Sequence, residues 1–223
     1  MSTTDWSVRR LHTVSEAEIE GLTDLLIDCV EGGASVSFMQ PLTRGRAVEF
    51  WRRVVQGVVA GERAVLVAED GRGLCGTVQL IFDLPENQPH RADLVKMLVH
   101  RRARRRGLGT ALMRAAEVTA QECGKTLLVL DAVTGGDGAR LYERLGWVRV
   151  GDIPGYALFP QGGFCSTTFY YRELEKGGNV SPPKSQTQAP MKHEIKGSGQ
   201  SDFKYSTRSC FCAVLRLSPR KPL

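Results

Sequence analysis

Five arginines precede a glycine-rich turn near the middle of the chain, in the segment Arg101-Arg102-Ala103-Arg104-Arg105-Arg106-Gly107-Leu108-Gly109. An apolar segment, 94–99, comes before this turn, and small and apolar residues at helical spacing follow it over 110–119. A strand that enters a helix through such a turn exposes backbone N–H groups at the positive end of the helix dipole, which suits a phosphate. The alternative is an ordinary strand–loop–helix corner with a solvated basic turn, because short glycine patterns are weak signals.

The segments on either side of this turn predict the elements that must position it. Strands are expected at 6–14, 64–68, 74–82, 92–100, 126–130, 147–150 and 164–171, and helices at 16–30, 44–59, 107–122 and 139–145. Ser15 and Glu18 form a capping-box pattern at the start of the first helix. Segments 31–40 and 151–163 are expected to be loops. This order of elements predicts an α+β (mixed α/β) domain with one largely antiparallel sheet.

The charge of the chain is distributed unevenly. The chain has 223 residues and a net charge of +6. Segment 176–223 holds nine basic and two acidic residues, so the other 175 residues carry a net charge of −1. The basic excess therefore belongs to the tail, and no nucleic-acid-binding motif is present. We predict a folded domain over 1–175 and a basic, disordered tail over 176–223, because the tail begins with a stretch rich in Gly, Ser, Pro and Gln.

The location of the protein is predicted from its cysteines and its N-terminus. The six cysteines have no metal-ligand spacing, so we expect reduced thiols and no metal site. The first residues are polar, and no apolar run reaches the length of a membrane helix. These features predict a cytoplasmic protein with no membrane partner.

Two motifs together resemble those of the GNAT superfamily of acetyltransferases. Arg104-x-x-Gly107-x-Gly109, between a strand and a helix, is similar to the acyl-CoA signature of that superfamily. Ala139-Arg-Leu-Tyr-Glu-Arg-Leu-Gly-Trp147 is similar to its second motif, a helix with a tyrosine that ends in Leu-Gly-aromatic. The resemblance covers roughly 8–174. It implies a GNAT-like fold, with helices on both faces of a sheet that splays at the acetyl-CoA site.

Four shorter segments resemble the tabtoxin resistance group of this superfamily, in which a β-lactam amino-acid toxin is acetylated. They are Gly32-Gly-Ala-Ser-Val-Ser-Phe-Met39, Arg91-Ala-Asp93, Leu130-Asp131 and Pro154-Gly-Tyr156. This resemblance implies an enzyme of the same subgroup, and not necessarily the same substrate.

The superfamily resemblance implies acetyl-CoA as the co-substrate and indicates which residues hold it. Backbone groups of Met97, Leu98 and Val99 would contact the pantetheine arm, and an N–H of Leu98 or Val99 would hold the oxyanion. The residues expected at the pyrophosphate are Arg104, Arg105, Arg106, Gly107, Leu108, Gly109 and Thr110. The side chains of Arg101, Arg102 and Arg105 are expected to face solvent or the 3′-phosphate of CoA. Many family members place an Asn before the second-motif helix, and this sequence has Asp137 there instead.

Three side chains are candidates for the acetyl transfer itself. Asp93 and Asp131 match the two carboxylates of the tabtoxin resistance group, and the sequence leaves open which is the base. An unperturbed Asp has a pKa of about 3.9, so burial or mutual repulsion would have to raise one of the two. Tyr142 is the candidate acid for the leaving thiolate. The structural alternatives are a strand-start Asp93, a turn Asp131 and a Tyr142 that packs against pantetheine.

The acceptor site is expected between two loops. Phe38 and Met39 lie in the loop 31–40, which is either a lip over a cleft or a plain packed connection. The substrate-binding residues we expect are Ser35, Phe38, Met39, Asp93, Asp131 and Tyr156.

The sequence thus predicts an N-acetyltransferase that moves acetyl from acetyl-CoA to a primary amine of a small molecule. A role in antibiotic or toxin resistance would follow from the subgroup. Two alternatives stay open: a protein acetyltransferase acting on N-terminal or lysine amines, and a non-catalytic acyl-CoA-binding module. A homodimer is expected from the superfamily alone.

Overall fold

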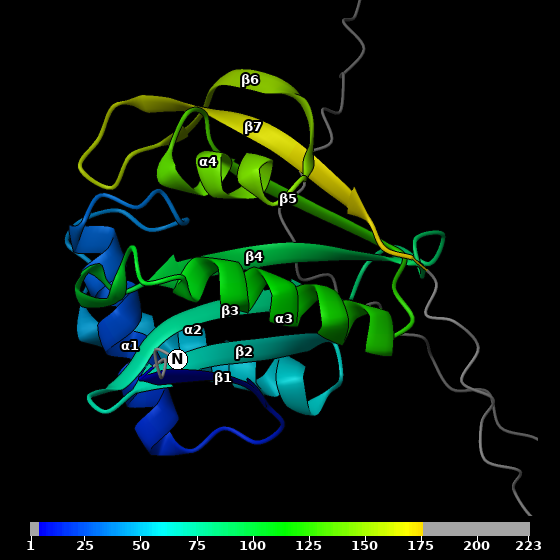
Figure 1. The fold of residues 1–223 in the computed structure, drawn as a ribbon. Helices are drawn as coiled ribbons and strands as arrows, with labels where there is room; N and C mark the ends of the chain where they lie inside the picture. Colours follow the sequence, from blue (N-terminus) through cyan, green and yellow to red (C-terminus); the bar gives the residue numbers. More distant parts are fainter. Residues whose placement is uncertain (1–4, 176–223) are drawn as a thin grey trace, which may run out of the picture. The chain divides into compact units, whose positions relative to one another are not determined.

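The computed structural model describes residues 5–175, which form a single seven-stranded sheet with helices on both faces (Figure 1). The spatial order of the strands is β1-β2-β3-β4-β5-β7-β6. The strands are β1 (Trp6–Leu11), β2 (Arg63–Asp70), β3 (Gly73–Ile81), β4 (Arg91–Val99), β5 (Leu127–Val133), β6 (Val148–Leu158) and β7 (Phe164–Glu173). The GNAT fold and the α+β class expected from the sequence are confirmed.

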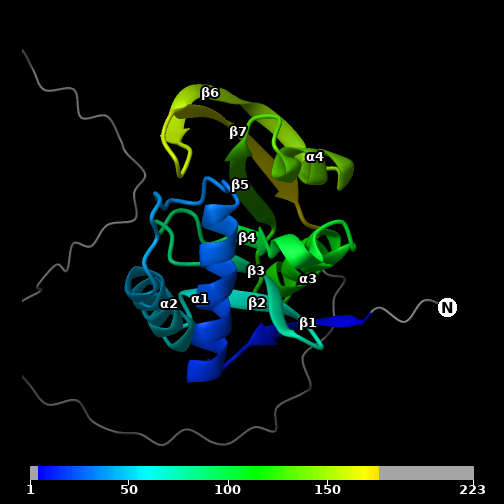
Figure 2. The ribbon, with the colours of Figure 1, turned by 90° about the vertical axis from the view of Figure 1, so that its left-hand side faces the viewer.

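The helices divide into two pairs, one on each face of the sheet (Figure 2). The helices are α1 (Glu16–Glu31), α2 (Arg44–Val59), α3 (Leu108–Glu122) and α4 (Asp137–Arg144), with a short 3₁₀ turn, η1 (Arg101–Ala103), before α3. Apolar residues of α1 and α2 form one buried cluster on one side of the sheet, together with residues of β2. Apolar residues of α3 and α4 form a second buried cluster with β2 to β5 on the other side. We call these sides the α1/α2 face and the α3/α4 face.

Hydrogen bonds at both ends of α1 explain where the helix begins and ends. Ser15 and Glu18 form a complete capping box, in which the Ser15 hydroxyl accepts from the Glu18 N–H and the Glu18 carboxylate accepts from the Ser15 N–H. The helix continues to Glu31, and Gly32 closes it by donating its N–H to the Asp28 carbonyl at 2.9 Å. This confirms the capping prediction.

The sheet opens between β4 and β5. These strands are parallel and pair over only three residues, Arg91–Asp93 with Leu127–Val129. All other neighbouring strands are antiparallel. Beyond Asp93 the two strands separate, as the ribbon shows (Figure 1). The splay expected at this strand is therefore confirmed, and it begins directly after Asp93.

A bulge in β4 follows the start of this splay. Leu98 pairs with Thr77 and Val95 pairs with Gln79, so two residues of β4, Lys96 and Met97, oppose one residue of β3. The extra residue inverts the alternation of side chains. Leu94 packs in the cluster of the α3/α4 face, whereas Leu98 packs in that of the α1/α2 face.

Three predicted boundaries were wrong. Strand β6 continues through the predicted loop 151–163 as far as Leu158, because β7 still pairs with it across register shifts on both sides of Pro154–Tyr156. Strand β5 continues past Asp131 to Val133, because β7 pairs with it along its whole length. Helix α4 begins at Asp137, two residues before the prediction.

The predicted tail, 176–223, lies outside the described residues. The chain divides into two units, Met1–Val180 and Ser181–Leu223, and the described residues belong to the first. No helix within 5–175 is long and apolar enough to span a membrane. Within the same range, no group of three or more acidic, histidine or cysteine side chains has the arrangement of a metal site.

Candidate active site

The turn before α3 has the features of an anion site. Gly107 is the N-cap of α3 with φ 84°, a left-handed conformation that glycine adopts without strain. No side chain within 5–175 caps this helix start. The N–H groups of Leu108, Gly109 and Thr110 have no acceptor within the helix, because they belong to its first turn. The turn therefore offers three N–H donors and the positive end of the helix dipole to a phosphate.

Gly109 is required by close packing. A Cβ atom at this position would lie 3.0 Å from Cδ2 of Leu141 on α4 and 3.9 Å from Cε of Met97 on β4. A side chain would therefore push α4 or fill the space in front of the turn. The backbone at the start of α3 stays accessible because residue 109 has no side chain.

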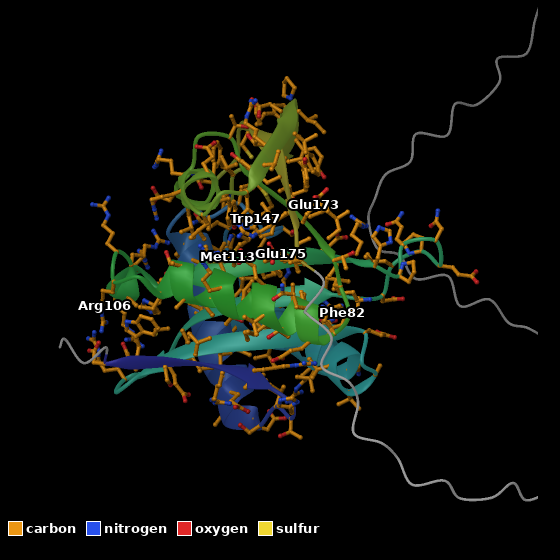
Figure 3. All side chains as sticks on the ribbon, turned by 45° about the vertical axis from the view of Figure 1, so that its right-hand side comes forward. Phe82, Arg106, Met113, Trp147, Glu173 and Glu175 are labelled. Carbon is orange, nitrogen blue, oxygen red and sulfur yellow. The ribbon has the colours of Figure 1, made fainter. Side chains whose placement is uncertain are left out.

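Three of the five arginines hold the turn in place and do not point to a ligand. Arg101 pairs with Asp28 of α1 at 2.8 Å, although half of its side chain stays exposed. Arg102 pairs with Asp70 of β2 at 2.5 Å, and Arg106 lies 3.5 Å from the same carboxylate. Figure 3 shows Arg106 at the outer end of this turn. The expectation that Arg102 faces solvent or the 3′-phosphate was wrong, because the almost fully buried carboxylate of Asp70 binds it. Arg101 is exposed to solvent as expected, but it is also bound to Asp28.

The other two arginines lie next to α4. Arg104 donates from Nε to the carbonyl of Val99 at 3.2 Å, and Arg105 is exposed with φ 61°. Both contribute, after the ion pair with Arg140, to lowering the pKa of Asp137. The carboxylate of Asp137 is bound by Arg140 at 2.5 Å. Arg104 and Arg105 are thus the two arginines of the turn that have no carboxylate partner within 4 Å among the described residues.

Asp93 and Asp131 lie on the same face of the sheet. Asp93 pairs with Val129, and Asp131 is two residues further along β5, so their side chains point the same way. The neighbours of Asp93 and Val129 in the strands, Leu94 and Leu128, pack on the α3/α4 face. Both carboxylates therefore face α1 and α2. The charge of Asp131 contributes to raising the pKa of Asp93, so the two groups interact.

The two carboxylates differ in their partners. Asp93 forms an ion pair with Arg91 at 2.8 Å, which partly offsets the rise in its pKa caused by burial. Burial also raises the pKa of Asp131, and the opposing charge is that of Lys96. Within 5–175, Asp131 has no ion pair closer than 4 Å. Asp131 is thus the carboxylate that remains available to a ligand.

Lys96 is a site residue that we did not single out from the sequence. It lies in the bulge of β4, and its Nζ donates to Oγ of Ser37 at 3.1 Å. Burial lowers the pKa of Lys96 to about 8, with a smaller contribution from Arg63 and an opposing one from Asp131. The signal in the sequence was a single lysine inside the apolar segment 94–99.

Tyr142 lies on the opposite face of the sheet from the two carboxylates. It is 5% exposed and packs against Tyr170 and Trp147, with ring centroids 5.9 and 6.0 Å apart respectively. Burial raises its pKa, and the nearby charge of Asp131 adds to this rise. The hydroxyl is therefore protonated throughout the neutral pH range.

The predicted acceptor residues come from a loop and a strand that touch. Ser35 donates from Oγ to the carbonyl of Leu158 at 2.9 Å, and the Gln40 N–H donates to the carbonyl of Pro160 at 2.8 Å. These bonds join the loop after α1 to the end of β6 and the turn that follows it. A surface hollow beside them is lined by Glu31, Gln40, Pro41, Leu42 and Gln161. The loop is thus a packed connection to β6 as well as a border of the site.

Aromatic contacts link the other predicted acceptor residues to the sheet. Phe38 packs edge-on against Phe50 of α2, with centroids 5.2 Å apart, whereas Met39 is 40% exposed. Tyr156 of β6 packs edge-on against Phe169 of β7 at 5.7 Å, and Phe169 pairs with Asp131. The structure thus connects Tyr156 with Asp131 through a single residue and places Phe38 on the α2 side.

Comparison with known proteins agrees with this geometry. Residues 61–149 match the family described as acetyltransferase (GNAT) domain. This range includes the turn before α3, both aspartates and Tyr142.

Solved structures share the fold at low sequence identity. A phosphinothricin acetyltransferase of the GNAT superfamily from Sinorhizobium meliloti, in complex with acetyl-CoA, is 18% identical, with a TM-score of 0.64 over 81% of this chain and 94% of that one. A GCN5-related N-acetyltransferase from Kribbella flavida is 22% identical, with a TM-score of 0.64 over 78% and 100%. A ribosomal-protein-alanine N-acetyltransferase from Brucella melitensis is 20% identical, with a TM-score of 0.64 over 75% and 99%.

The solved structures thus show that this chain has the fold of GNAT acetyltransferases, and residues 61–149 are similar to the GNAT acetyltransferase domain.

Proposed function

We propose that this chain transfers the acetyl group of acetyl-CoA to a primary amine of a small molecule, and that Asp131 is the base. The observation that carries the proposal is the separation of β4 and β5 directly after Asp93. Three groups support the proposal: a helix start with no side-chain cap, a buried tyrosine, and a carboxylate with no ion pair within residues 5–175.

The donor side is formed by the turn before α3 and the second half of β4. The N–H groups of Leu108, Gly109 and Thr110 bind the pyrophosphate, and Arg104 and Arg105 supply positive charge nearby. Met97 and Val99 line the path of the pantetheine. N–H groups of successive strand residues point to alternate sides, so one of the Leu98 and Val99 amides faces β3 and the other faces the opening. That second amide is the donor to the oxyanion.

The acceptor side begins at Asp131. Its carboxylate takes a proton from the acceptor ammonium, directly or through one water, and the neutral amine then attacks the thioester carbon. A nitrogen–carbon bond forms, the nitrogen releases its second proton to solvent, and the carbon–sulfur bond breaks. Tyr142 donates its hydroxyl proton to the departing thiolate and regains a proton from solvent. Asp93, already paired with Arg91, keeps negative charge beside the ammonium without being the base.

The subgroup resemblance supplies the first acceptor to test. The segments shared with the tabtoxin resistance group include Asp93, Asp131 and Tyr156, all of which border the site. A β-lactam amino acid is therefore the leading candidate, and detoxification in the cytoplasm is the biological role that we propose. A homodimer, which the superfamily favours, belongs to the same proposal.

A protein acetyltransferase is the second candidate. One of the structures with the same fold acetylates the alanine of a ribosomal protein. Such an enzyme needs room for a peptide on both sides of the amine. The bonds from Ser35 and Gln40 to the end of β6 and the turn after it close one side here, which favours a compact acceptor.

Thiol release from acetyl-CoA tests these alternatives with the full chain. The panel contains primary amines, amino acids, β-lactam amino acids and N-terminal peptides. We expect turnover with at least one small amine, and a loss of at least about 100-fold in kcat for Asp131→Asn. Turnover with peptides only would overturn the small-molecule proposal, and binding of acetyl-CoA without any turnover would identify a non-catalytic module.

A further inference from the structure

Lys96 and Ser37 form an unusual pair on the α1/α2 face. Lys96 has φ 53° and Ser37 has φ 73°, so both adopt a left-handed backbone that residues with a Cβ avoid. Such conformations are strained for residues with a Cβ, and they gather at functional sites. The two strained residues meet each other, because Nζ of Lys96 donates to Oγ of Ser37 at 3.1 Å. The bulge and the loop after α1 thus direct a cation and a hydroxyl to one point.

A second lysine in the described chain, Lys125, has a similar aromatic contact but a different hydrogen-bond acceptor. Lys125 and Lys96 each lie over a phenyl ring, at 5.4 Å from the centroid of Phe82 and 5.9 Å from that of Phe50 respectively. Lys125 also donates to the carbonyl of Pro89 at 2.8 Å, at the surface end of β5. Lys96 has a hydroxyl in place of a carbonyl, and within 5–175 no carboxylate lies within 4 Å of its Nζ. Its positive charge therefore has no ion-pair partner within the described residues, although the charge of Asp131 acts on it from further away.

The sheet next to Lys96 carries further donors. Gln79 pairs with Val95, the residue before Lys96, and is 1% exposed. The Nε2 of Gln79 and the Nε of Arg63, which donates from Nη1 to Gln79 at 3.2 Å, have no acceptor within the described residues. Arg63 is close enough to contribute to the lowered pKa of Lys96. This part of the face is thus electropositive, whereas the part at Asp93 and Asp131 is electronegative.

Positive and negative side chains occupy separate parts of this face, which indicates an acceptor that carries both a negative and a positive group. We propose that Lys96 and Ser37 bind a carboxylate of the acceptor, while Asp131 holds its ammonium group. The substrate class is then amino acids, with the reacting amine at the opening between β4 and β5. The inference rests on the proposed function and extends it with a specificity residue. Lys96 contacts the substrate here but does not transfer its proton.

The test compares matched acceptors that differ only in the carboxylate. Each amino acid that supports turnover is assayed beside its amide, with the wild-type full chain and with Lys96→Met. Lys125→Met is the control, because it removes the other lysine that lies over a phenyl ring. We expect wild-type kcat/KM to favour the acid over the amide by about tenfold or more, which corresponds to about 1.4 kcal/mol. In Lys96→Met this preference disappears through a higher KM for the acid, whereas Lys125→Met retains it.

A second measurement needs no variant and covers the case in which Lys96→Met does not fold. Carboxylic acids that lack the amine should inhibit the wild-type enzyme competitively against the acceptor, and their amides should not. Equal inhibition by acids and amides would overturn the inference.

Failure of the inference and failure of the proposed function give different results. If wild-type enzyme acetylates amides and acids equally well, the proposed function stands and the carboxylate site is wrong. If Lys96→Met lowers kcat equally for both acceptors with unchanged KM, Lys96 acts in proton transfer and the carboxylate site is again wrong. If no amine is acetylated, the proposed function fails and the inference fails with it.

Discussion

Asp131 and Tyr142 lie on opposite faces of the sheet, yet the charge of Asp131 raises the pKa of the Tyr142 hydroxyl. A sheet normally separates groups on its two faces. Here the β4–β5 ladder ends at Asp93 and Val129, so the ladder does not lie between these two side chains. In the proposed reaction the base takes its proton on one face and the acid gives its proton on the other, with the thioester between them.

The first prediction concerns the base. Asp131→Asn should lower kcat by about 100-fold to 10,000-fold, because general base catalysis contributes that much. Asp93→Asn should have a smaller effect on kcat and a larger one on the acceptor KM, since Asp93 is already bound to Arg91. Steady-state rates of thiol release measure both. The exposed Asp137→Asn is the control, and equal kcat losses in the Asp93 and Asp131 variants would contradict the assignment.

The second prediction concerns the acid. Tyr142→Phe should lower kcat by about 10-fold to 100-fold, toward the lower end of what general acid–base catalysis contributes. The acetyl-CoA KM should stay nearly unchanged, because the ring still packs against Tyr170 and Trp147. Thermal unfolding should show little loss, since the ring contacts with Tyr170 and Trp147 are retained. An unchanged kcat would show that Tyr142 only packs.

The third prediction concerns the donor turn. Gly109→Val should raise the KM for acetyl-CoA by at least about tenfold, because its side chain would collide with Leu141 and cover the N–H groups at the start of α3. Gly45→Ala on α2 is the control, since a Cβ there meets nothing within 4 Å. That control should raise stability by up to about 1 kcal/mol, through helix propensity. Calorimetric titration with CoA separates binding from turnover.

The fourth prediction concerns pH. The pKa of Lys96 is lowered to about 8, so its charge is present below that pH and is lost as the pH rises through it. The KM for carboxylate acceptors should therefore rise above about pH 8, and the KM for their amides should not. Asp131 and Arg63 are the charged groups that act on Lys96. A parallel rise for both acceptors would assign the effect to another group.

The fifth prediction concerns stability. Asp70→Ala should destabilise the domain by about 2 kcal/mol, because it removes the carboxylate that binds Arg102 and lies near Arg106. The ion pair with Arg102 lowers the pKa of Asp70. Its stabilisation is therefore present above the usual Asp pKa of about 3.9 and is lost as the pH falls below it. Urea unfolding at pH 7 and pH 3 measures this, and an equal difference between variant and wild type at both values would contradict it.

The sequence predicted the parts of the site that depend on short-range patterns. The turn at Gly107, the capping box at Ser15 and the tyrosine helix at Tyr142 are encoded within a few neighbouring residues, and all three form as expected. The roles of Arg101 and Arg102 were not predictable, because their partners Asp28 and Asp70 lie about 70 and 30 residues away.

Two other features depend on strand pairing and were therefore missed. Pro154 and Gly155 indicate a loop, but β7 pairs with β6 on both sides of them. Lys96 interrupts an apolar strand, and only the register with Thr77 and Gln79 shows that a bulge places it there. In both cases the deciding contacts join strands that no local pattern identifies.

The bulge at Lys96 also has a consequence for how the sequence of this protein can change in evolution. Side chains of β4 before the bulge alternate in one phase and those after it in the other. In the proposed function, Asp93 and Lys96 would therefore serve the acceptor, while Met97 and Val99 would line the donor path. A substitution at Lys96 or in the loop around Ser37 can alter which amine is accepted without moving the turn at Gly107. A descendant of this protein can therefore acquire a new acceptor and keep the same acetyl donor.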